Sequence, residues 1–124
     1  MQKRIIKKLL KEEKIDALLI NSNHNRLWYT TFDSTAGYLL VTKTESYLIL
    51  DGRYIEAGTV KAKNVDQVIL MKNINDQIND LIKVHNIERL GFESENTAYA
   101  LFIKWTQVFA TQLKAVSMNN VRMI

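Results

Sequence analysis

Three acidic residues stand beside apolar runs that predict β-strands, which makes them the first candidates for chemistry. Asp51 and Glu93 each close such a run, and Asp33 precedes one. Carboxylate oxygens gathered at strand ends can hold magnesium for two-metal phosphoryl transfer, the chemistry of a ribonuclease-H-like nuclease. Acidic residues in these places also serve as helix caps, and the sequence favours that interpretation. A magnesium-dependent nuclease therefore stays as an alternative for these acids.

Few other residues offer a catalytic group. The chain has two histidines and no cysteine, so it has no thiol nucleophile or disulfide, and we expect no zinc site built by this chain alone. It also lacks the Gly-rich, Gly-x-Ser-x-Gly and His-Glu-x-x-His motifs of common enzymes. Arg26, next to His24 in a polar loop, could bind a carboxylate or tie the loop to the domain. We favour the structural role for Arg26, and also for His85 on the apolar face of a predicted helix.

A hairpin must position these groups, and the rest of the chain is organised around it. Residues 38–41 and 47–50 are apolar runs joined by a polar turn at 42–46. Runs that are apolar in both registers predict strands covered on both faces of a sheet. The hairpin is therefore expected in the middle of a layered α/β domain.

Both ends of the hairpin carry short segments that a plain hairpin does not need. A loop of small residues, 32–37, precedes it, and the sequence Asp51-Gly52-Arg53-Tyr54 follows it. Asp51 is predicted to cap a helix that runs from Gly52 onward.

The remaining pattern alternates helices with short strands. Helices are expected in residues 1–14, at 26–29, from 52, at 73–86 and at 98–109, and strands at 15–20, 66–71, 89–93 and 112–117. This order predicts a three-layer α/β domain whose mixed central sheet contains the β-hairpin and has helices on both faces. A chain of 124 residues with 47% hydrophobic residues is long enough for one such domain.

The net charge of +4 draws on a cluster of cations in the first predicted helix: Lys3, Arg4, Lys7, Lys8, Lys11 and Lys14. Because they fall opposite an apolar stripe, we expect a solvated outer face. No aromatic residue interleaves with them to stack on bases, which argues against nucleic-acid binding. The same charges interrupt every apolar run there, so neither a signal peptide nor a membrane span is expected.

Two segments resemble one protein family. NRLWYTTFDSTAGYLLVT and YLILDGRYIEAG, with the order of the elements, resemble the N-terminal domain of the Xaa-Pro peptidases, the creatinase, prolidase and aminopeptidase P group. The resemblance implies a ribonuclease-H-like architecture without nuclease activity. It also implies a domain over residues 1–118, with residues 119–124 starting the linker to a C-terminal pita-bread metallopeptidase domain.

The resemblance further implies a cytosolic, oligomeric parent protein, with a dimer expected, that acts on proline-containing peptides. Its second domain would hold two manganese, cobalt or zinc ions with two Asp, one His and two Glu. This chain would then carry no catalytic residue, metal or cofactor, and its own C-terminal catalytic domain would be its partner. The alternative is a peptide- or protein-binding module of a catalytically dead homologue, such as a histone chaperone with the same two-domain plan.

The family also implies roles for two groups of residues. Its N-terminal domain builds the oligomer, and a loop reaches over the active site of a neighbouring subunit. On this chain the candidates for that contact are Phe32, Asp33, Ser34, Thr35 and Arg26, with Asp33 meeting the free amino group of a short substrate. In the matching motif Asp51-Gly52-Arg53-Tyr54, Arg53 hydrogen bonds and Tyr54 packing are expected to lock the helix start against the preceding loop, in preference to a contact with substrate.

Overall fold

The computed structural model describes residues 1–119 of the 124-residue chain. Its helices are α1 (Gln2–Glu13), α2 (Asn23–Thr30), α3 (Ile55–Lys61), α4 (Ile74–Val84) and α5 (Tyr99–Val108). Its strands are β1 (Ala17–Ile20), β2 (Tyr38–Thr42), β3 (Ser46–Leu50), β4 (Gln67–Leu70), β5 (Arg89–Glu93) and β6 (Gln112–Val116). The linker expected at 119–124 lies outside the described residues except for Asn119.

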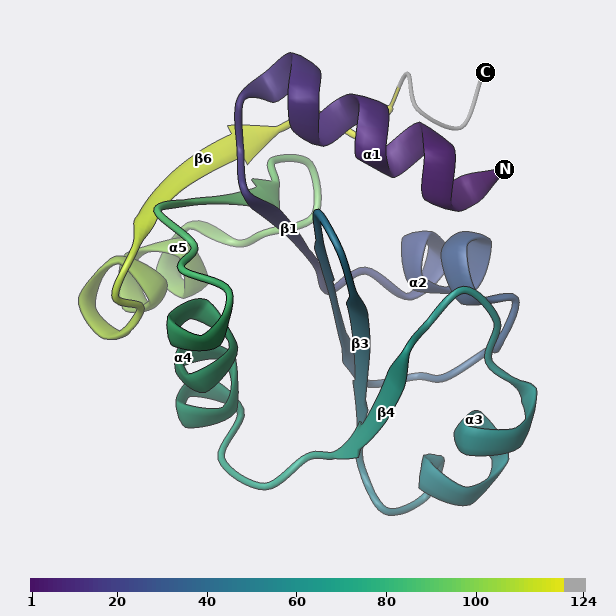
Figure 1. The fold of residues 1–124 in the computed structure, drawn as a ribbon. Helices are drawn as coiled ribbons and strands as arrows, with labels where there is room; N and C mark the ends of the chain where they lie inside the picture. The colour runs from purple at the N-terminus through teal and green to yellow at the C-terminus, as the bar shows by residue number, and fades with distance from the viewer. Residues whose placement is uncertain (120–124) are drawn as a thin grey trace.

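The six strands form one mixed sheet in the order β4-β3-β2-β1-β5-β6. β2 pairs antiparallel with β1 and with β3, whereas the other neighbours are parallel. The predicted hairpin is confirmed, with Leu39 opposite Leu48 and Leu40 opposite Tyr47. Figure 1 shows this hairpin between the two groups of helices, so it occupies the middle of the domain as expected.

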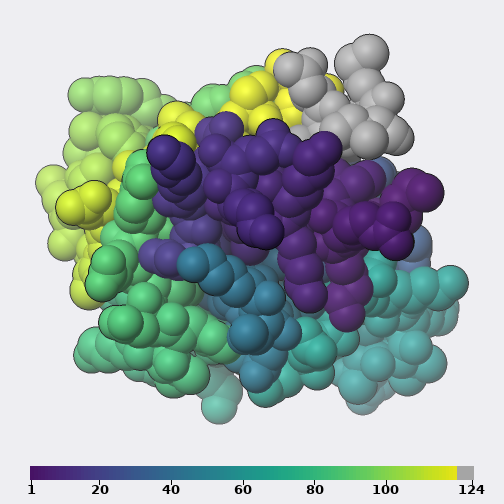
Figure 2. All heavy atoms as spheres, turned by 45° about the horizontal axis from the view of Figure 1, so that its top comes forward, coloured from purple at the N-terminus to yellow at the C-terminus, as the bar shows by residue number. Residues whose placement is uncertain are grey.

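Helices cover both faces of the sheet, which confirms the predicted three-layer α/β fold. In Figure 1, α4 and α5 lie on one side of the strands, and α1, α2 and α3 cover the other. Figure 2 shows the purple spheres of α1 on the outer surface of the domain, and the basic side chains of residues 3–14 are exposed, as expected. Because successive strand residues point to opposite faces, β1 supplies Leu18 and Ile20 to one core and Ala17 and Leu19 to the other. No helix within residues 1–119 has the length and apolar content needed to cross a membrane.

The helix after the hairpin starts later than the sequence predicted. We expected Asp51 to cap a helix from Gly52, but α3 begins at Ile55 and has no side-chain cap. The Asp51 carboxylate instead accepts a hydrogen bond from the Arg53 backbone N–H at 2.9 Å. The Asp51 carbonyl accepts another from the Tyr54 N–H, which closes a tight turn before the helix can start. The prediction was wrong because a short acidic side chain can satisfy a turn as well as a helix end.

Two positions explain how helices pack against β3. Gly58 of α3 is buried, and a Cβ there would overlap the end of the Leu50 side chain, so glycine lets α3 lie this close to the sheet without displacing Leu50. At the end of α4, the His85 ring packs edge-on against Tyr47, and its Nε2 lies 2.6 Å from the Tyr47 hydroxyl. That hydroxyl donates to Glu45, and burial with this bond raises the pKa of Tyr47 to about 12. These contacts confirm the packing role predicted for His85.

Candidate functional site

The loop of residues 32–37, between α2 and β2, has two buried and two exposed side chains. Phe32 and Ser34 are buried, whereas Asp33 and Thr35 are exposed. The loop ends at Gly37, whose φ of +153° is rare for other residues, and a Cβ there would lie 3.0 Å from two atoms of β3. The loop is therefore anchored in the domain, and it presents Asp33 and Thr35 to its surroundings.

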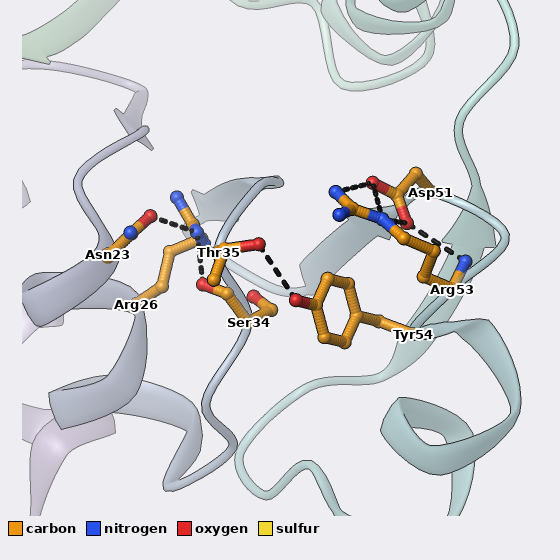
Figure 3. Close-up of polar contacts among 7 residues, drawn as sticks. All are labelled: Asn23, Arg26, Ser34, Thr35, Asp51, Arg53 and Tyr54. Atoms are coloured by element: carbon orange, nitrogen blue, oxygen red, sulfur yellow. Dashed lines mark hydrogen bonds and ion pairs between the residues drawn. The ribbon is translucent and has the colours of Figure 1, made fainter.

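Arg26 holds this loop from the side of α2. Its side chain is almost fully buried, with Nη1 donating to the Asn21 carbonyl at 2.6 Å. Nη2 donates to Asn23 Oδ1 at 2.6 Å and to the Ser34 carbonyl at 2.8 Å (Figure 3). Burial lowers the pKa of Arg26, and the nearby negative charge of Glu93 opposes that effect. Because both terminal nitrogens are bound inside the domain, the geometry matches the tying role rather than a clamp on substrate.

Tyr54 holds the loop from the opposite side. Its hydroxyl lies 2.7 Å from Thr35 Oγ1, and the two groups point toward each other in Figure 3. The Tyr54 ring also packs edge-on against Phe32, with 6.4 Å between ring centroids. The last residue of the Asp-Gly-Arg-Tyr motif therefore contacts the loop directly.

Arg53 binds within its own motif and not to the loop at 32–37. Its guanidinium donates to Asp51 at 2.8 Å, and Figure 3 shows this pair beyond Tyr54. The hydrogen bond from Arg53 is the main cause that lowers the pKa of Asp51. Because the Arg53 side chain is 67% exposed, solvent screens the pair and its contribution to stability is small. Within the motif, Tyr54 contacts the loop at 32–37, whereas Arg53 holds the segment before α3.

Glu93, at the end of β5, is the centre of a buried polar cluster. Its Oε1 accepts the backbone N–H groups of Asn21 at 2.7 Å and Ser22 at 2.9 Å. Its Oε2 accepts the Ser22 hydroxyl at 2.7 Å and the side-chain amides of Asn25 and Asn96. Glu93 is 0% exposed, so these donors replace the water that an ionised carboxylate needs. The carboxylate therefore fixes the start of α2 to the sheet.

Asn21 links this carboxylate to the arginine. Its N–H donates to Glu93, while its carbonyl accepts from Arg26. We call Glu93, Asn21 and Arg26, together with the Ser34 carbonyl, the Glu93–Arg26 network. The network runs from the end of β5 to the candidate loop and links two buried charged groups through the backbone of one residue, Asn21.

The sequence did not indicate this network. Glu93 was recognised only as a strand-end acid, and its partners at Asn21, Ser22 and Asn25 lie about 70 residues earlier in the chain. Ser22 and Asn25 do have the spacing of a helix cap, since the Ser22 hydroxyl accepts the Asn25 N–H at 3.4 Å. That signal would have extended the expected helical turn at 26–29 to the observed α2, but it carries no information about Glu93.

The acids that suggested a nuclease have separate roles. Asp33 is exposed on the loop, Asp51 closes the turn before α3, and Glu93 is saturated by internal donors. No three His, Cys, Asp or Glu side chains within residues 1–119 are grouped to hold a metal ion. Asp33, Asp51 and Glu93 therefore do not come together as one metal-binding group in this part of the chain. His24 lies exposed on α2.

We expect Tyr54→Phe to loosen the loop without disturbing the domain. The variant loses the hydrogen bond to Thr35 but keeps the ring contact with Phe32, so the free energy of unfolding should fall by about 0.5–1 kcal/mol. Urea denaturation followed by circular dichroism measures the loss. Tyr99→Phe is the matched control, because Tyr99 is 77% exposed on α5. Equal stability of Tyr54→Phe and the unmodified protein would show that the hydroxyl contact does not hold the loop.

The comparison with known families decides what this domain is. The sequence model of the creatinase/prolidase N-terminal domain matches residues 4–124. The chain belongs to this family. The match includes the loop, the hairpin and the Asp-Gly-Arg-Tyr motif, so the family resemblance stated from the sequence is confirmed.

Two curated relatives of this creatinase/prolidase N-terminal domain come from mycoplasmas. The putative Xaa-Pro aminopeptidase of Mycoplasma genitalium is 31% identical over 120 residues, which cover 97% of this chain and 33% of that protein. The putative Xaa-Pro aminopeptidase of Mycoplasma pneumoniae is 36% identical over 102 residues, 81% of this chain and 28% of that protein. The chain thus spans about a third of the length of the curated relatives that it matches.

Solved structures have the same fold. The Xaa-Pro dipeptidase from Bacillus anthracis superimposes with a TM-score of 0.87 at 25% identity, over 94% of this chain and 33% of that one. An aminopeptidase P from Streptococcus thermophilus gives a TM-score of 0.89 at 22% identity, over 98% of this chain and 96% of that one. The second match shows that a chain of nearly this extent occurs by itself in a solved structure of the fold.

Proposed function

We propose that this creatinase/prolidase N-terminal domain is the non-catalytic module of a cytosolic Xaa-Pro metallopeptidase. In this proposal it joins subunits into an oligomer, with a dimer expected, and covers the active site of a neighbouring subunit. Family membership supports the proposal, as do mycoplasma relatives that are named Xaa-Pro aminopeptidases and are about three times longer. The substrates of the whole protein would be proline-containing peptides.

The observation that carries the covering role is the construction of the loop at 32–37. Arg26 binds the Ser34 carbonyl on one side, and Tyr54 binds Thr35 on the other. Asp33 directly precedes the two anchored residues, Ser34 and Thr35, and its side chain is exposed. A fixed acid of this kind can form a charge-assisted hydrogen bond with the ammonium group of a short peptide bound in the adjacent subunit.

Hydrolysis belongs to the rest of the protein in this proposal. Two manganese, cobalt or zinc ions in a C-terminal domain would activate the attacking water, as is usual for dinuclear hydrolases. Residues 1–119 contain no group of ligands that fits such a metal. In this proposal the domain contributes to the reaction by covering the active site of a neighbouring subunit and by positioning the substrate.

We expect Asp33→Ala, made in a full-length protein that carries this domain, to lower kcat/KM for an Xaa-Pro dipeptide about tenfold. The physical reason is the loss of one charge-assisted contact to the substrate ammonium. Because Asp33 is exposed, the variant should keep its fold and its oligomer mass. Asp80→Ala, an exposed acid on α4, is the matched control and should retain full efficiency. Unchanged efficiency of Asp33→Ala with an intact oligomer would remove Asp33 from the covering role.

Reading the source gene past Ile124 tests the broader proposal. We expect the frame to continue into a domain with two Asp, one His and two Glu at the spacing of a pita-bread metallopeptidase. A continuing frame with those ligands replaced would favour the alternative of a catalytically dead binding module. A frame that stops at Ile124 would contradict the proposal, because no catalytic domain would then follow this one.

A further inference from the structure

The pair Asp51-Gly52 leaves an exposed peptide bond between β3 and α3. Gly52 is exposed, and no atom lies within 4 Å of the place that a Cβ would take there. Its φ is not positive, unlike that of Gly37, so neither a close contact nor the backbone conformation requires a glycine at this position. In the described part of the chain the Gly52 N–H donates no hydrogen bond. The nitrogen of this peptide bond is therefore open to reaction.

The Asp51 carboxyl group lies beside this peptide bond. Its Oδ1 accepts the N–H of Arg53, the residue beyond Gly52, at 2.9 Å. The side chain therefore folds along the chain toward its own C-terminal neighbours, as in other turns that Asp or Asn closes. Because Gly52 has no side chain, nothing on that residue blocks the approach of its nitrogen to Asp51 Cγ. The two residues are thus placed to close a succinimide ring.

The ring closure is a dehydration that needs no co-reactant. The Gly52 nitrogen forms a bond to Asp51 Cγ, the carboxyl C–O bond breaks, and the hydroxyl leaves as water with the proton from the nitrogen. Water then opens the succinimide at the main-chain carbonyl carbon of Asp51 and breaks the bond between that carbon and nitrogen. The main chain now runs through Asp51 Cβ and Cγ, so the product is an isoaspartate of unchanged mass.

Arg53 opposes the first step of this reaction. Its Nη2 donates to Asp51 Oδ2 at 2.8 Å, and its guanidinium lies 5.2 Å over the centre of the Tyr54 ring (Figure 3). The hydrogen bond from Arg53 holds the pKa of Asp51 below its ordinary value, so the carboxyl group stays ionised. An ionised carboxylate reacts poorly with the amide nitrogen, because its oxygen cannot leave directly as water.

We propose that the bond between Asp51 and Gly52 is a site of spontaneous isoaspartate formation, and that the Arg53 side chain slows this modification. The effect reaches the loop at 32–37. The Asp51 carbonyl accepts the Tyr54 N–H at 3.1 Å, and the longer main chain of isoaspartate removes this carbonyl from the turn. Tyr54 then shifts away from Thr35, so the loop loses one of its two anchors as the protein ages. This inference does not rest on the peptidase function.

The test is to age the 124-residue chain for several weeks at neutral pH and physiological temperature. Peptide mapping with electron-transfer fragmentation distinguishes isoaspartate from aspartate at each position. We expect isoaspartate to accumulate at Asp51 and not at Asp80, an exposed acid that precedes the bulky Leu81 on α4. Absence of isoaspartate at Asp51 overturns the proposal. Equal accumulation at Asp80 also overturns it, because the reaction would then not depend on this turn.

Matched variants test the roles of Arg53 and Gly52. Arg53→Gln removes the guanidinium, and we expect isoaspartate at Asp51 to form about threefold faster or more. Lys61→Gln removes one exposed cation from α3 and should leave the rate unchanged. Gly52→Ala fits the open space there and should slow the reaction about tenfold. An unchanged rate in Arg53→Gln overturns the protective role, and an unchanged rate in Gly52→Ala overturns the ring closure.

Hydrogen exchange of the aged protein tests the effect on the loop. We expect amide exchange at 32–37 to rise with the isoaspartate content, because Tyr54 no longer binds Thr35. Exchange in α4, on the other face of the sheet, should stay unchanged. Unchanged exchange at 32–37 in protein that is rich in isoaspartate at Asp51 would overturn this consequence.

Discussion

Glu93→Gln is expected to destabilise the domain by about 3 kcal/mol. The substitution keeps the size of the side chain but replaces one carboxylate oxygen, an acceptor, with an NH₂ group, a donor. That amide would face either the backbone N–H groups of Asn21 and Ser22 or the side chains of Ser22 and Asn25, all of which donate to Glu93. Because the site is buried, the lost bonds are not replaced by water. A domain of this size has only about 5–15 kcal/mol of stability, so the loss is large.

Urea denaturation followed by circular dichroism gives the free energy of unfolding for this test. Glu88→Gln is the matched control, because Glu88 is exposed just before β5 and its change should stay within about 0.5 kcal/mol. A Glu93→Gln protein as stable as the control would show that the carboxylate charge is not needed at the start of α2. Should Glu93→Gln fail to fold, Asn25→Ala removes a single donor to Glu93 and should cost about 1–2 kcal/mol.

Arg26→Lys should destabilise the domain by about 2 kcal/mol and release the loop at 32–37. The planar guanidinium reaches three acceptors, on Asn21, Asn23 and Ser34, from two nitrogens. A lysine keeps the positive charge, but its single terminal nitrogen cannot reach all three acceptors. Hydrogen exchange of the loop amides should rise more than the global loss of stability predicts, because the Ser34 anchor is lost locally.

Arg53→Lys is the control for this experiment. Arg53 is exposed, where it binds Asp51 and lies 5.2 Å over the centre of the Tyr54 ring, so the same substitution should cost less than about 1 kcal/mol. It should also leave exchange in the loop unchanged. Unchanged loop exchange in Arg26→Lys would contradict the anchoring role of Arg26, whatever its effect on global stability.

Much of the fold follows from local pattern. The apolar runs that form β2 and β3 identify buried strands, and the stripe of Ile78 and Ile82 identifies the buried side of α4, because burial imposes a period that the sequence must repeat. The segment from Asp51 to Tyr54 was harder, since an acid followed by glycine fits both a helix cap and a turn. Only the hydrogen bonds decide between them, and they place the start of α3 at Ile55.

The contacts of the candidate site were harder to predict from the sequence than the fold. Asp33 and Thr35 could be assigned to a loop, but which of its residues face outward depends on where Arg26 and Tyr54 bind it. Those contacts join residues that are 8 and 19 positions apart, and Glu93 joins residues still further apart. Periodicity reports whether a residue is buried, but it does not report which distant group satisfies a buried charge.

The strand order also has a consequence in time. β1 to β4 are all complete by Leu70 and pair with one another, whereas the other edge of β1 is covered only by β5. During synthesis at about 5–20 residues/s, the ribosome needs about 1–5 s to add residues 71–93. For that interval β1 is an apolar edge strand, and the start of α2 lacks the carboxylate that holds it. We therefore expect nascent chains that stall before Arg89 to be the form most prone to aggregate or to bind chaperones.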